Sequence, residues 1–169
     1  MTILKALEIQ ALREALDDEH HAWATYDQVI SDFGEVLPFT NIREAEARHI
    51  DALRTLFVRY DVPIPANPWP GKVPHYPSLA AACEDGVQAE IANAALYDRL
   101  MAATDRSDIL TVLENLRAAS QERHLPAFRR ALERPGEGGC GLGPRRFRGG
   151  RSGSGGPGGE WRRKGRTEA

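Results

Sequence analysis

One helical hairpin pattern occurs twice in the amino-acid sequence, and this duplication limits the chain to few folds. The phrase EARHIDALR at residues 46–54 returns as QERHLPAFR at residues 121–129. Upstream of each copy stands a glutamate, Glu19 or Glu90, that is followed seven residues later by a tyrosine and an aspartate. The sequence therefore predicts two related hairpins, each made of two helices.

Apolar residues recur at steps of three and four over four segments, which is the period of an amphipathic helix. The first helix should end at Gly34, because glycine commonly stops a helix, and the third should begin after the cap residue Ser78. Asp17 and Asp18 fall on the face opposite the first stripe. No segment has the pattern of a strand, so we predict an all-α domain. The four stripes are Leu12, Ala15, Leu16, Glu19, Ala22, Trp23, Tyr26 and Ile30; Ile42, Ala45, Glu46, His49, Leu53, Leu56, Phe57 and Tyr60; Leu79, Cys83, Val87, Glu90, Ala94, Tyr97 and Met101; and Leu110, Leu113, Arg117, Gln121, His124, Phe128 and Leu132.

The connections predict how the hairpins are arranged. Each hairpin has a linker of about five residues, so its two helices should be antiparallel neighbours. Residues 61–77, between the hairpins, contain six prolines, which excludes a helix and favours an extended course of ~3.1 Å per residue. Such a segment reaches roughly 50 Å, whereas a helix of about twenty residues is only ~30 Å long. We expect a four-helix bundle with a long proline-rich crossover, and a simple up-down-up-down bundle is the alternative.

The repeated polar residues lie on the apolar stripes, so the bundle would bury carboxylates and imidazoles in its core. An isolated buried charge loses its hydration, which is costly unless a partner compensates it. Glu46 and His49 are three residues apart and project from one helix face, so they can bind the same ion or adjacent ions. Carboxylate oxygen and neutral imidazole nitrogen together suit iron or manganese, and also zinc. A pair of divalent metal ions would therefore compensate these buried groups.

On these residues the chain resembles the ferritin-like superfamily of di-metal carboxylate proteins, which includes ferritins, bacterioferritins and rubrerythrins. It is more closely similar to a bacterial ferritin-like family of unknown function that shares the RHLPAF ending. The resemblance covers roughly residues 5–133. It implies a ferritin-like four-helix bundle with one glutamate from each of two helices and Glu-x-x-His from each of the other two. The six implied metal ligands are Glu19, Glu46, His49, Glu90, Gln121 and His124.

The resemblance also implies a role for each ligand. Glu19 and Glu90 would be terminal carboxylates, Glu46 would be the bridge, and the two histidines would be terminal nitrogen ligands. Gln121 departs from the pattern, because the superfamily usually has a second bridging glutamate there. The implied cofactor is iron, as two ions or as one if Gln121 does not bind, and manganese is the alternative metal.

Pro126 is a second departure, two residues after the last histidine of the pattern. A proline inside the fourth helix removes the backbone bond to the carbonyl of Glu122, and it should kink the helix beside the proposed site. Glu122 could then turn inward as a substitute ligand.

The remaining aromatic and histidine residues are weaker candidates for the site. Tyr26 and Tyr97 are either core aromatics or hydrogen-bond donors to metal-bound carboxylates. His20, His21 and His75 have no partner in the repeat, and we predict that they lie at the surface.

The function implied by this resemblance is that of a ferritin-like oxidoreductase that reacts iron with dioxygen or peroxide as its small-molecule substrate. No paired CxxC motifs are present to form a rubredoxin-type iron site, so electrons would come from a separate electron donor or from ferrous iron itself. One alternative is a metal-binding or storage bundle without turnover. Another is a scaffold whose basic tail binds nucleic acid. A homodimer is compatible with any of these functions.

The chain divides at residue 134 by composition. Residues 1–134 are expected to form the bundle, and residues 135–169, with eight basic and three acidic residues and most of the glycines, a disordered Gly/Arg-rich tail. The tail alone has the arginine, glycine and aromatic composition of segments that contact nucleic acid. No apolar stretch of signal-peptide or membrane-spanning length is present, so we expect a cytoplasmic protein with no membrane partner.

Overall fold

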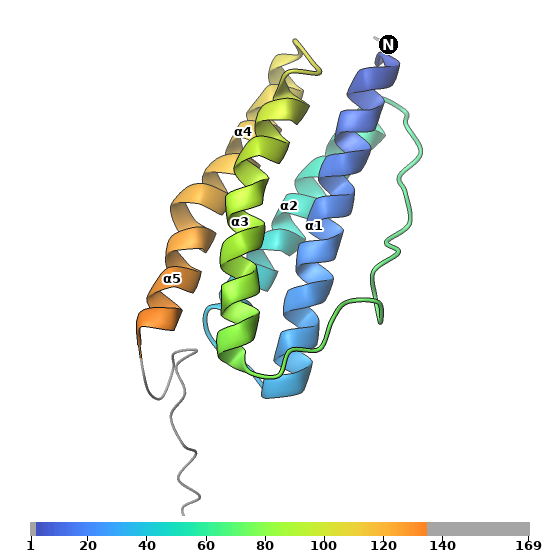
Figure 1. Ribbon diagram of the computed structural model, residues 1–169. Helices are drawn as coiled ribbons and strands as arrows, with labels where there is room; N and C mark the ends of the chain where they lie inside the picture. Colours follow the sequence, from blue (N-terminus) through green and yellow to red (C-terminus); the bar gives the residue numbers. More distant parts are fainter. Residues whose placement is uncertain (1–2, 135–169) are drawn as a thin grey trace, which may run out of the picture.

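The computed structural model describes residues 3–134, and within them every regular element is helical (Figure 1). Three helices are continuous, α1 (Ala6–Phe33), α2 (Phe39–Arg59) and α3 (Leu79–Met101). The fourth consists of α4 (Ser107–Ala119), a π-helical turn η1 (Ser120–His124) and α5 (Leu125–Glu133). The all-α prediction is thus confirmed. The predicted tail at residues 135–169, with its proposed disorder and nucleic-acid binding, lies outside the described residues.

The two hairpins are joined by the long crossover that the prolines predicted. Helix α1 packs mainly on α2, and α3 packs on α4 and α5. Between the hairpins the chain runs along the outside of α1, so α3 begins at the end of the bundle opposite to the end of α2 (Figure 1). Arg59 at the end of α2 forms a 2.7 Å ion pair with Asp108 at the start of α4, because both lie at the same end. The alternative up-down-up-down topology is therefore wrong.

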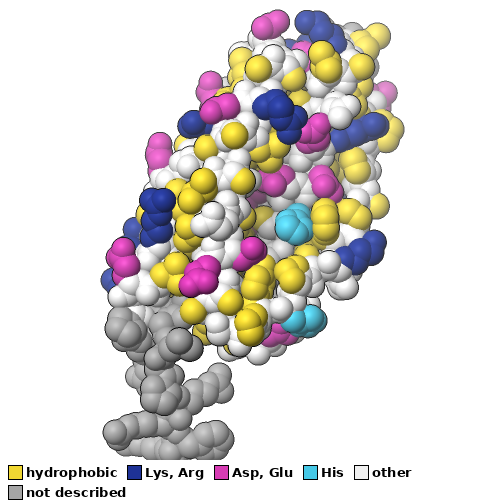
Figure 2. All heavy atoms as spheres, viewed as in Figure 1, with side chains coloured by type: hydrophobic (Ala, Val, Ile, Leu, Met, Phe, Trp, Pro, Cys, Tyr) yellow, Lys and Arg dark blue, Asp and Glu magenta, His cyan; other side chains and the backbone are white. Residues whose placement is uncertain are grey.

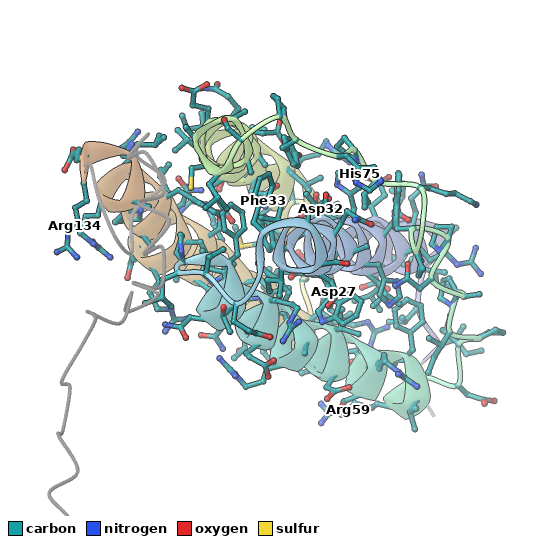
Figure 3. The ribbon with its side chains drawn as sticks, turned by 90° about the horizontal axis from the view of Figure 1, so that it is seen from below. Asp27, Asp32, Phe33, Arg59, His75 and Arg134 are labelled. Atoms are coloured by element: carbon teal, nitrogen blue, oxygen red, sulfur yellow. The ribbon has the colours of Figure 1, made fainter. Side chains whose placement is uncertain are left out.

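The crossover is held against α1 by side chains from its middle and from its second half. The indole Nε1 of Trp69 donates to Asp17 Oδ1 at 2.9 Å, and the ring of Trp69 packs edge-on against His21. Further along the crossover, Nδ1 of His75 lies 2.8 Å from Oδ2 of Asp32 (Figure 3). His21 and His75 are both exposed, as predicted. These contacts explain how a segment without helical hydrogen bonds keeps a defined course.

The ends of the helices follow the local sequence. Gly34 has a φ of 88°, a conformation that glycine adopts without steric cost, and it ends α1 with its N–H bonded to the carbonyl of Ile30 at 2.8 Å. Ser78 caps α3, since its hydroxyl accepts from the backbone N–H of Ala81 at 3.1 Å. Both predicted boundaries are confirmed.

The apolar core is divided into two clusters by a polar layer. The cluster towards the first residues of α1 contains Leu12, Leu16, Leu53, Phe57, Tyr97 and Leu113, among others. The cluster at the other end contains Tyr26, Val29, Phe39, Ile42, Cys83 and Phe128, among others. Buried glutamates and a buried histidine lie between the clusters along the helices. The duplicated polar residues therefore occupy the middle of the bundle.

The outer surface carries charges of both signs. On the face shown in Figure 2, acidic and basic side chains are interspersed with small apolar areas over the helices. Among residues 3–134, every helix is too short or too polar to cross a bilayer.

The fourth helix differs from its prediction by one position at several residues, whereas Leu113, His124 and Phe128 are buried as predicted. The predicted stripe included Arg117 and Gln121, but the buried positions of α4 are Ile109, Leu113, Leu116 and Ala119, and the π turn begins with the buried Ser120. The backbone N–H of Leu125 bonds to the carbonyl of Ser120, five residues back, which defines the π turn. Pro126 follows directly and lacks the N–H that would bond to Glu122. The predicted disturbance beside Pro126 is therefore a π turn that accommodates one extra residue.

Candidate metal centre

Five of the six predicted ligands meet in the polar layer at the middle of the bundle. Glu19, Glu46, Glu90 and His124 are each at most 5% exposed, and the side chain of His49 is 14% exposed. They form two groups that could hold a metal ion, because the possible ligand atoms in each lie within 4.8 Å of one another. The first group is Glu19, Glu46 and His49, and the second is Glu46, Glu90 and His124. Glu46 belongs to both.

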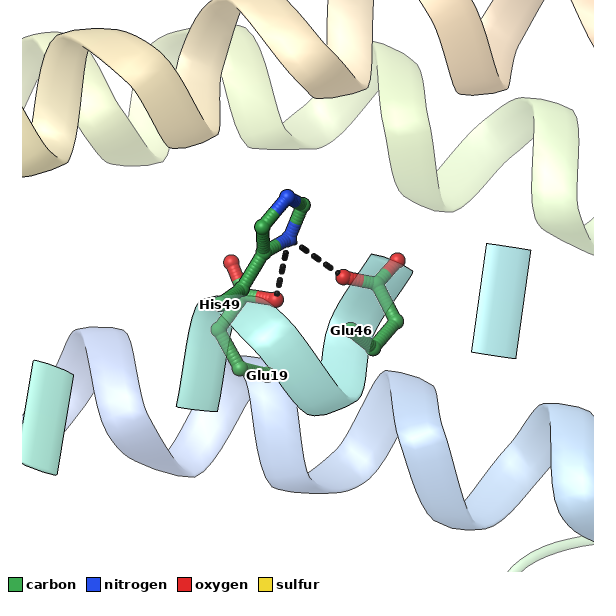
Figure 4. A group of neighbouring side chains, drawn as sticks. All are labelled: Glu19, Glu46 and His49. Carbon is green, nitrogen blue, oxygen red and sulfur yellow. Dashed lines mark hydrogen bonds and ion pairs between the residues drawn. The ribbon is translucent and has the colours of Figure 1, made fainter. Parts of the chain in front are cut away.

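The two oxygens of Glu46 face the two histidines separately. Oε2 lies 2.7 Å from Nδ1 of His49, and the same nitrogen is 3.2 Å from Oε2 of Glu19 (Figure 4). Oε1 lies 3.2 Å from Nδ1 of His124, which is also 3.4 Å from Oε1 of Glu90. The two imidazole rings stack with their centroids 5.6 Å apart. One carboxylate from α2 therefore connects two similar sets of ligand atoms.

Two tyrosines fix the outer carboxylates, each across the boundary between hairpins. The Tyr97 hydroxyl on α3 donates to Glu19 on α1. The Tyr26 hydroxyl on α1 donates to Glu90 on α3 at 3.2 Å. Each ring lies in one apolar cluster, Tyr97 in the first and Tyr26 in the second. The repeat is thus reciprocal, because the tyrosine of one copy orients the glutamate of the other.

The charges of this layer compensate one another when no metal is bound. Burial lowers the pKa of each histidine, but hydrogen bonds to the glutamates outweigh burial and raise the pKa of His49 to about 10 and that of His124 to about 9. Burial likewise raises the pKa of Glu46, but hydrogen bonds with the two histidines outweigh it and hold that pKa well below its ordinary value. In the metal-free protein, two imidazolium groups therefore provide the positive charge that metal ions would supply in the loaded protein.

Asp18 is a carboxylate of this layer that the sequence pattern placed on the wrong face. It is only half-exposed, and it lines the small central cavity together with Asn93 and Ser120. Burial, with the nearby charges of Glu46 and Glu90, raises the pKa of Asp18 to about 7. The prediction that Asp18 lies on the solvent face is wrong, because the residue stands three after Ala15 and four before Ala22 on the inner side of α1.

The donor set and one unsatisfied atom fit divalent metal ions. Oε2 of Glu90 is buried and has no hydrogen-bond partner among the described residues, which is costly for a carboxylate oxygen unless a ligand satisfies it. Each group offers two carboxylates and one imidazole Nδ1, a mixture that suits iron, manganese or zinc. Three protein ligands in each group would leave further coordination positions open. The residues present therefore fit a metal centre.

Gln121 does not line the central cavity. Its amide nitrogen donates to the backbone carbonyl of Glu90 and to the hydroxyl of Ser120. The π turn accounts for this placement, because a π turn advances by about 80° per residue rather than the ~100° of an α-helix. Ser120 and His124 therefore share one side, and Gln121 is rotated away. Glu122 is exposed and belongs to neither group, so the hypothesis that it turns inward is wrong.

His20 is buried, so the prediction that it lies at the surface is also wrong. It follows Leu16 by four residues and precedes Ala24 by four, and both of those are buried. Burial lowers the pKa of His20. Helical spacing could have placed this residue, although the repeat could not.

Comparison with known proteins shows that the chain is similar in structure to a solved protein. No family model matches the chain, and no curated protein matches it. Among solved structures it is similar to the hypothetical protein MJ0754 from Methanococcus jannaschii DSM 2661, with 26% identity and a TM-score of 0.69. The similarity covers 79% of this chain and 83% of that one. The helical arrangement is therefore shared with an archaeal protein, and what the site does must be argued from its geometry.

Proposed function

We propose that this protein is a di-metal carboxylate protein of the ferritin-like kind. One divalent ion is held by Glu19, Glu46 and His49, and a second by Glu46, Glu90 and His124. Iron is the proposed metal at both positions, or iron with manganese. The observation that carries the proposal is the pair of buried ligand groups that share Glu46.

The cost of the buried charges supports this proposal. Three glutamates lie in a layer between two apolar clusters, where unpaired carboxylates are strongly disfavoured. Protonated histidines compensate them in part, but they leave Oε2 of Glu90 without a partner. Two divalent ions would satisfy all three carboxylates and would displace the two imidazolium protons.

Each residue would have a defined task in the loaded protein. Glu46 presents one oxygen to each position, and the histidines present Nδ1. Tyr26 and Tyr97 orient the outer carboxylates by donating hydrogen bonds to them. When bound, iron supplies redox chemistry and open coordination positions.

The reaction that fits such a site is oxidation of ferrous iron by peroxide or dioxygen. Two ferrous ions that are oxidised to ferric ions release two electrons. With two protons, these electrons reduce one hydrogen peroxide molecule to two water molecules, or one dioxygen molecule to one hydrogen peroxide molecule. Ferrous iron is then itself the substrate, or a separate donor returns the electrons for another turnover.

Stopped-flow absorbance tests this reaction directly. The full-length protein is loaded anaerobically with ferrous ion and then mixed with peroxide or oxygenated buffer. We expect iron oxidation faster than that of free ferrous ion, and loss of the acceleration in the Glu46→Ala, His49→Ala variant. Asp51→Ala is the matched control, because it removes an exposed carboxylate from the same helix. Oxidation at the free-iron rate by the loaded wild type would exclude the oxidoreductase function.

A metal-binding bundle without turnover is the second candidate. The position of Gln121 favours this second candidate. The amide nitrogen of Gln121 donates a hydrogen bond to the backbone carbonyl of Glu90, so position 121 supplies no second bridging carboxylate. The stopped-flow experiment distinguishes the two candidates, because a storage or buffering site would retain iron without accelerating its oxidation.

A further inference from the structure

A pocket of about 360 Å³ lies on the outer side of the two site histidines. It is formed between α2 and the segment from η1 into α5, and its polar lining includes Arg48 and His49 from the first copy of the repeat and Arg123 and His124 from the second. Ile42 and Ala127 are among its apolar lining residues. Its volume is in the range of about 300–1,000 Å³ that is common for small-molecule sites.

The pocket arises where the fourth helix leaves α2. Before the π turn α4 packs mainly on α3 and also contacts α2, whereas beyond the turn α5 packs mainly on α3. The start of α2 and α5 still lie next to each other in the view from below (Figure 3). The pocket thus lies along α2, beside the π turn and the start of α5.

The histidine rings separate this pocket from the carboxylates. Nδ1 of each ring faces the glutamates, and both residues also line the pocket. Figure 4 shows the second ring nitrogen of His49 on the side away from Glu19 and Glu46. A histidine that gives Nδ1 to a metal carries its proton on Nε2, so this nitrogen becomes a hydrogen-bond donor.

Arg48 and Arg123 occupy equivalent positions of the repeat, each directly before its histidine. Both are exposed, and neither has an ion-pair partner among residues 3–134. Arg43 and Arg117, by contrast, are paired with Asp27 and Asp98. Two guanidinium groups are therefore available at the same pocket.

We propose that this pocket binds a small organic anion whose carboxylate or phosphate group is held by Arg48 and Arg123. Arginine suits such groups because its planar fork donates two parallel hydrogen bonds to their oxygens. Ile42 and Ala127 provide apolar contacts for the rest of the molecule. The anion would lie against the histidines without displacing Glu46. A metal-bound imidazole and an imidazolium each carry a proton on Nε2, so these donors are present with or without metal and the pocket does not depend on the proposed function.

Calorimetric titration of the full-length protein with benzoate and with inorganic phosphate tests the pocket. Each titration is made with the iron-loaded and the chelator-treated protein. We expect saturable binding of at least one anion, one per chain, and the anion that binds identifies the class. The Arg48→Gln, Arg123→Gln variant should bind at least about tenfold more weakly, since a hydrogen bond to a charged group contributes about 1.5–3 kcal/mol.

The repeat supplies a matched control for the change of charge. Arg54 and Arg129 are exposed and stand six residues after Arg48 and Arg123 in the two copies. The Arg54→Gln, Arg129→Gln variant should bind the anion within about twofold of wild type, because two equal charges are removed away from the pocket. A second variant, Ala127→Leu, fills the pocket without a change of charge and should also weaken binding.

The outcomes separate the pocket from the metal centre, because iron content is measured on every sample. An iron-loaded wild type that binds neither anion overturns the pocket and leaves the proposed function intact. If the two double arginine variants weaken anion binding equally, the pocket is also overturned, because the anion is then attracted only by the overall positive charge. A wild type that binds an anion but retains no iron after anaerobic loading with ferrous ion would support the pocket and count against the proposed function.

Discussion

Glu46 is the residue on which both proposed metal positions depend. Its two oxygens lie near His49 and His124, one oxygen to each ring. Glu19 and Glu90, by contrast, each belong to a single group. The repeat would place Gln121 opposite Glu46, but the π turn directs that amide to the backbone of α3. The proposed centre is therefore symmetric in its outer carboxylates and histidines, and asymmetric in the glutamate that the two groups share.

Removing either tyrosine hydroxyl should weaken one metal position selectively. Tyr97→Phe leaves Glu19 without its donor, and Tyr26→Phe does the same for Glu90, while the aromatic rings remain in the core. Loss of such a supporting hydrogen bond typically costs about 10–100-fold in metal affinity. Anaerobic titration with ferrous ion should show one weakened class of site in each variant.

Tyr60→Phe is the matched control for these variants. Its hydroxyl also donates to a carboxylate, Asp108, but at the end of the bundle and outside both metal groups. Equal loss of affinity in all three variants would contradict the assigned roles of Tyr26 and Tyr97.

At the scale of single residues, comparison of the two copies found five of the six side chains that it predicted for the site, and Gln121 is the one that lies elsewhere. The copies are offset by 71 residues in the first helix of each hairpin, so Glu19 corresponds to Glu90. Asp18 and His20 correspond to Ala89 and Ile91, and Asn93 corresponds to Ala22. Since these three polar residues have no polar counterpart, comparison of the copies could not find them, although helical spacing places Asn93 one turn after Glu90.

At the scale of elements, the end of α1 followed from Gly34, the start of α3 from Ser78, and the end of α2 from the prolines of residues 61–77. The long crossover followed from the reach of residues 61–77. The π turn was not predictable in the same way. One extra residue in the fourth helix changes the spacing of its apolar residues only slightly, and the ordinary helical period accommodates that change. Pro126 marked the correct place, but a proline alone does not distinguish a kink from a π turn.

The close packing of α3 on α5 makes Gly86 a sensitive position. A Cβ atom there would lie 2.8 Å from the ring of Phe128, which is four residues after His124. We expect Gly86→Ala to lower the free energy of unfolding by about 1–3 kcal/mol, although alanine ordinarily favours a helix by about 1 kcal/mol over glycine. Chemical denaturation of the chelator-treated protein measures the change.

A second substitution checks the physical cause. Phe128→Leu shortens the opposing side chain, so the cost of Gly86→Ala should be smaller in that background than in wild type. The same cost in both backgrounds would show that the ring of Phe128 is not responsible.

At the scale of the whole molecule, the proposed metal ions would compete with protons for the same buried layer. A histidine with a raised folded-state pKa contributes stability fully below its unfolded pKa of about 6.5, and this is lost as pH rises through the folded value. The folded values are about 10 for His49 and about 9 for His124. Burial beside Glu46 raises the pKa of Glu19, which acts in the same direction. The metal-free protein should therefore lose stability between pH 7 and pH 10.

Thermal melts of the chelator-treated protein over that range measure the effect. The melting temperature of wild type should fall more steeply with pH than that of the His49→Gln, His124→Gln variant, which lacks the two titrating groups. Iron-loaded wild type should not show the steep fall, because the metal ions replace the protons. Parallel curves for metal-free wild type and variant would contradict the assigned protonation.

The number of iron ions per chain tests the central claim most directly. The full-length protein is loaded anaerobically with ferrous ion, freed of excess metal and measured by elemental analysis beside Glu46→Ala and the surface control Asp51→Ala. Because both ligand groups contain Glu46, we predict about two iron ions per chain in wild type and control, and well below one in Glu46→Ala. Wild-type protein that retains well below one iron ion per chain would contradict the account.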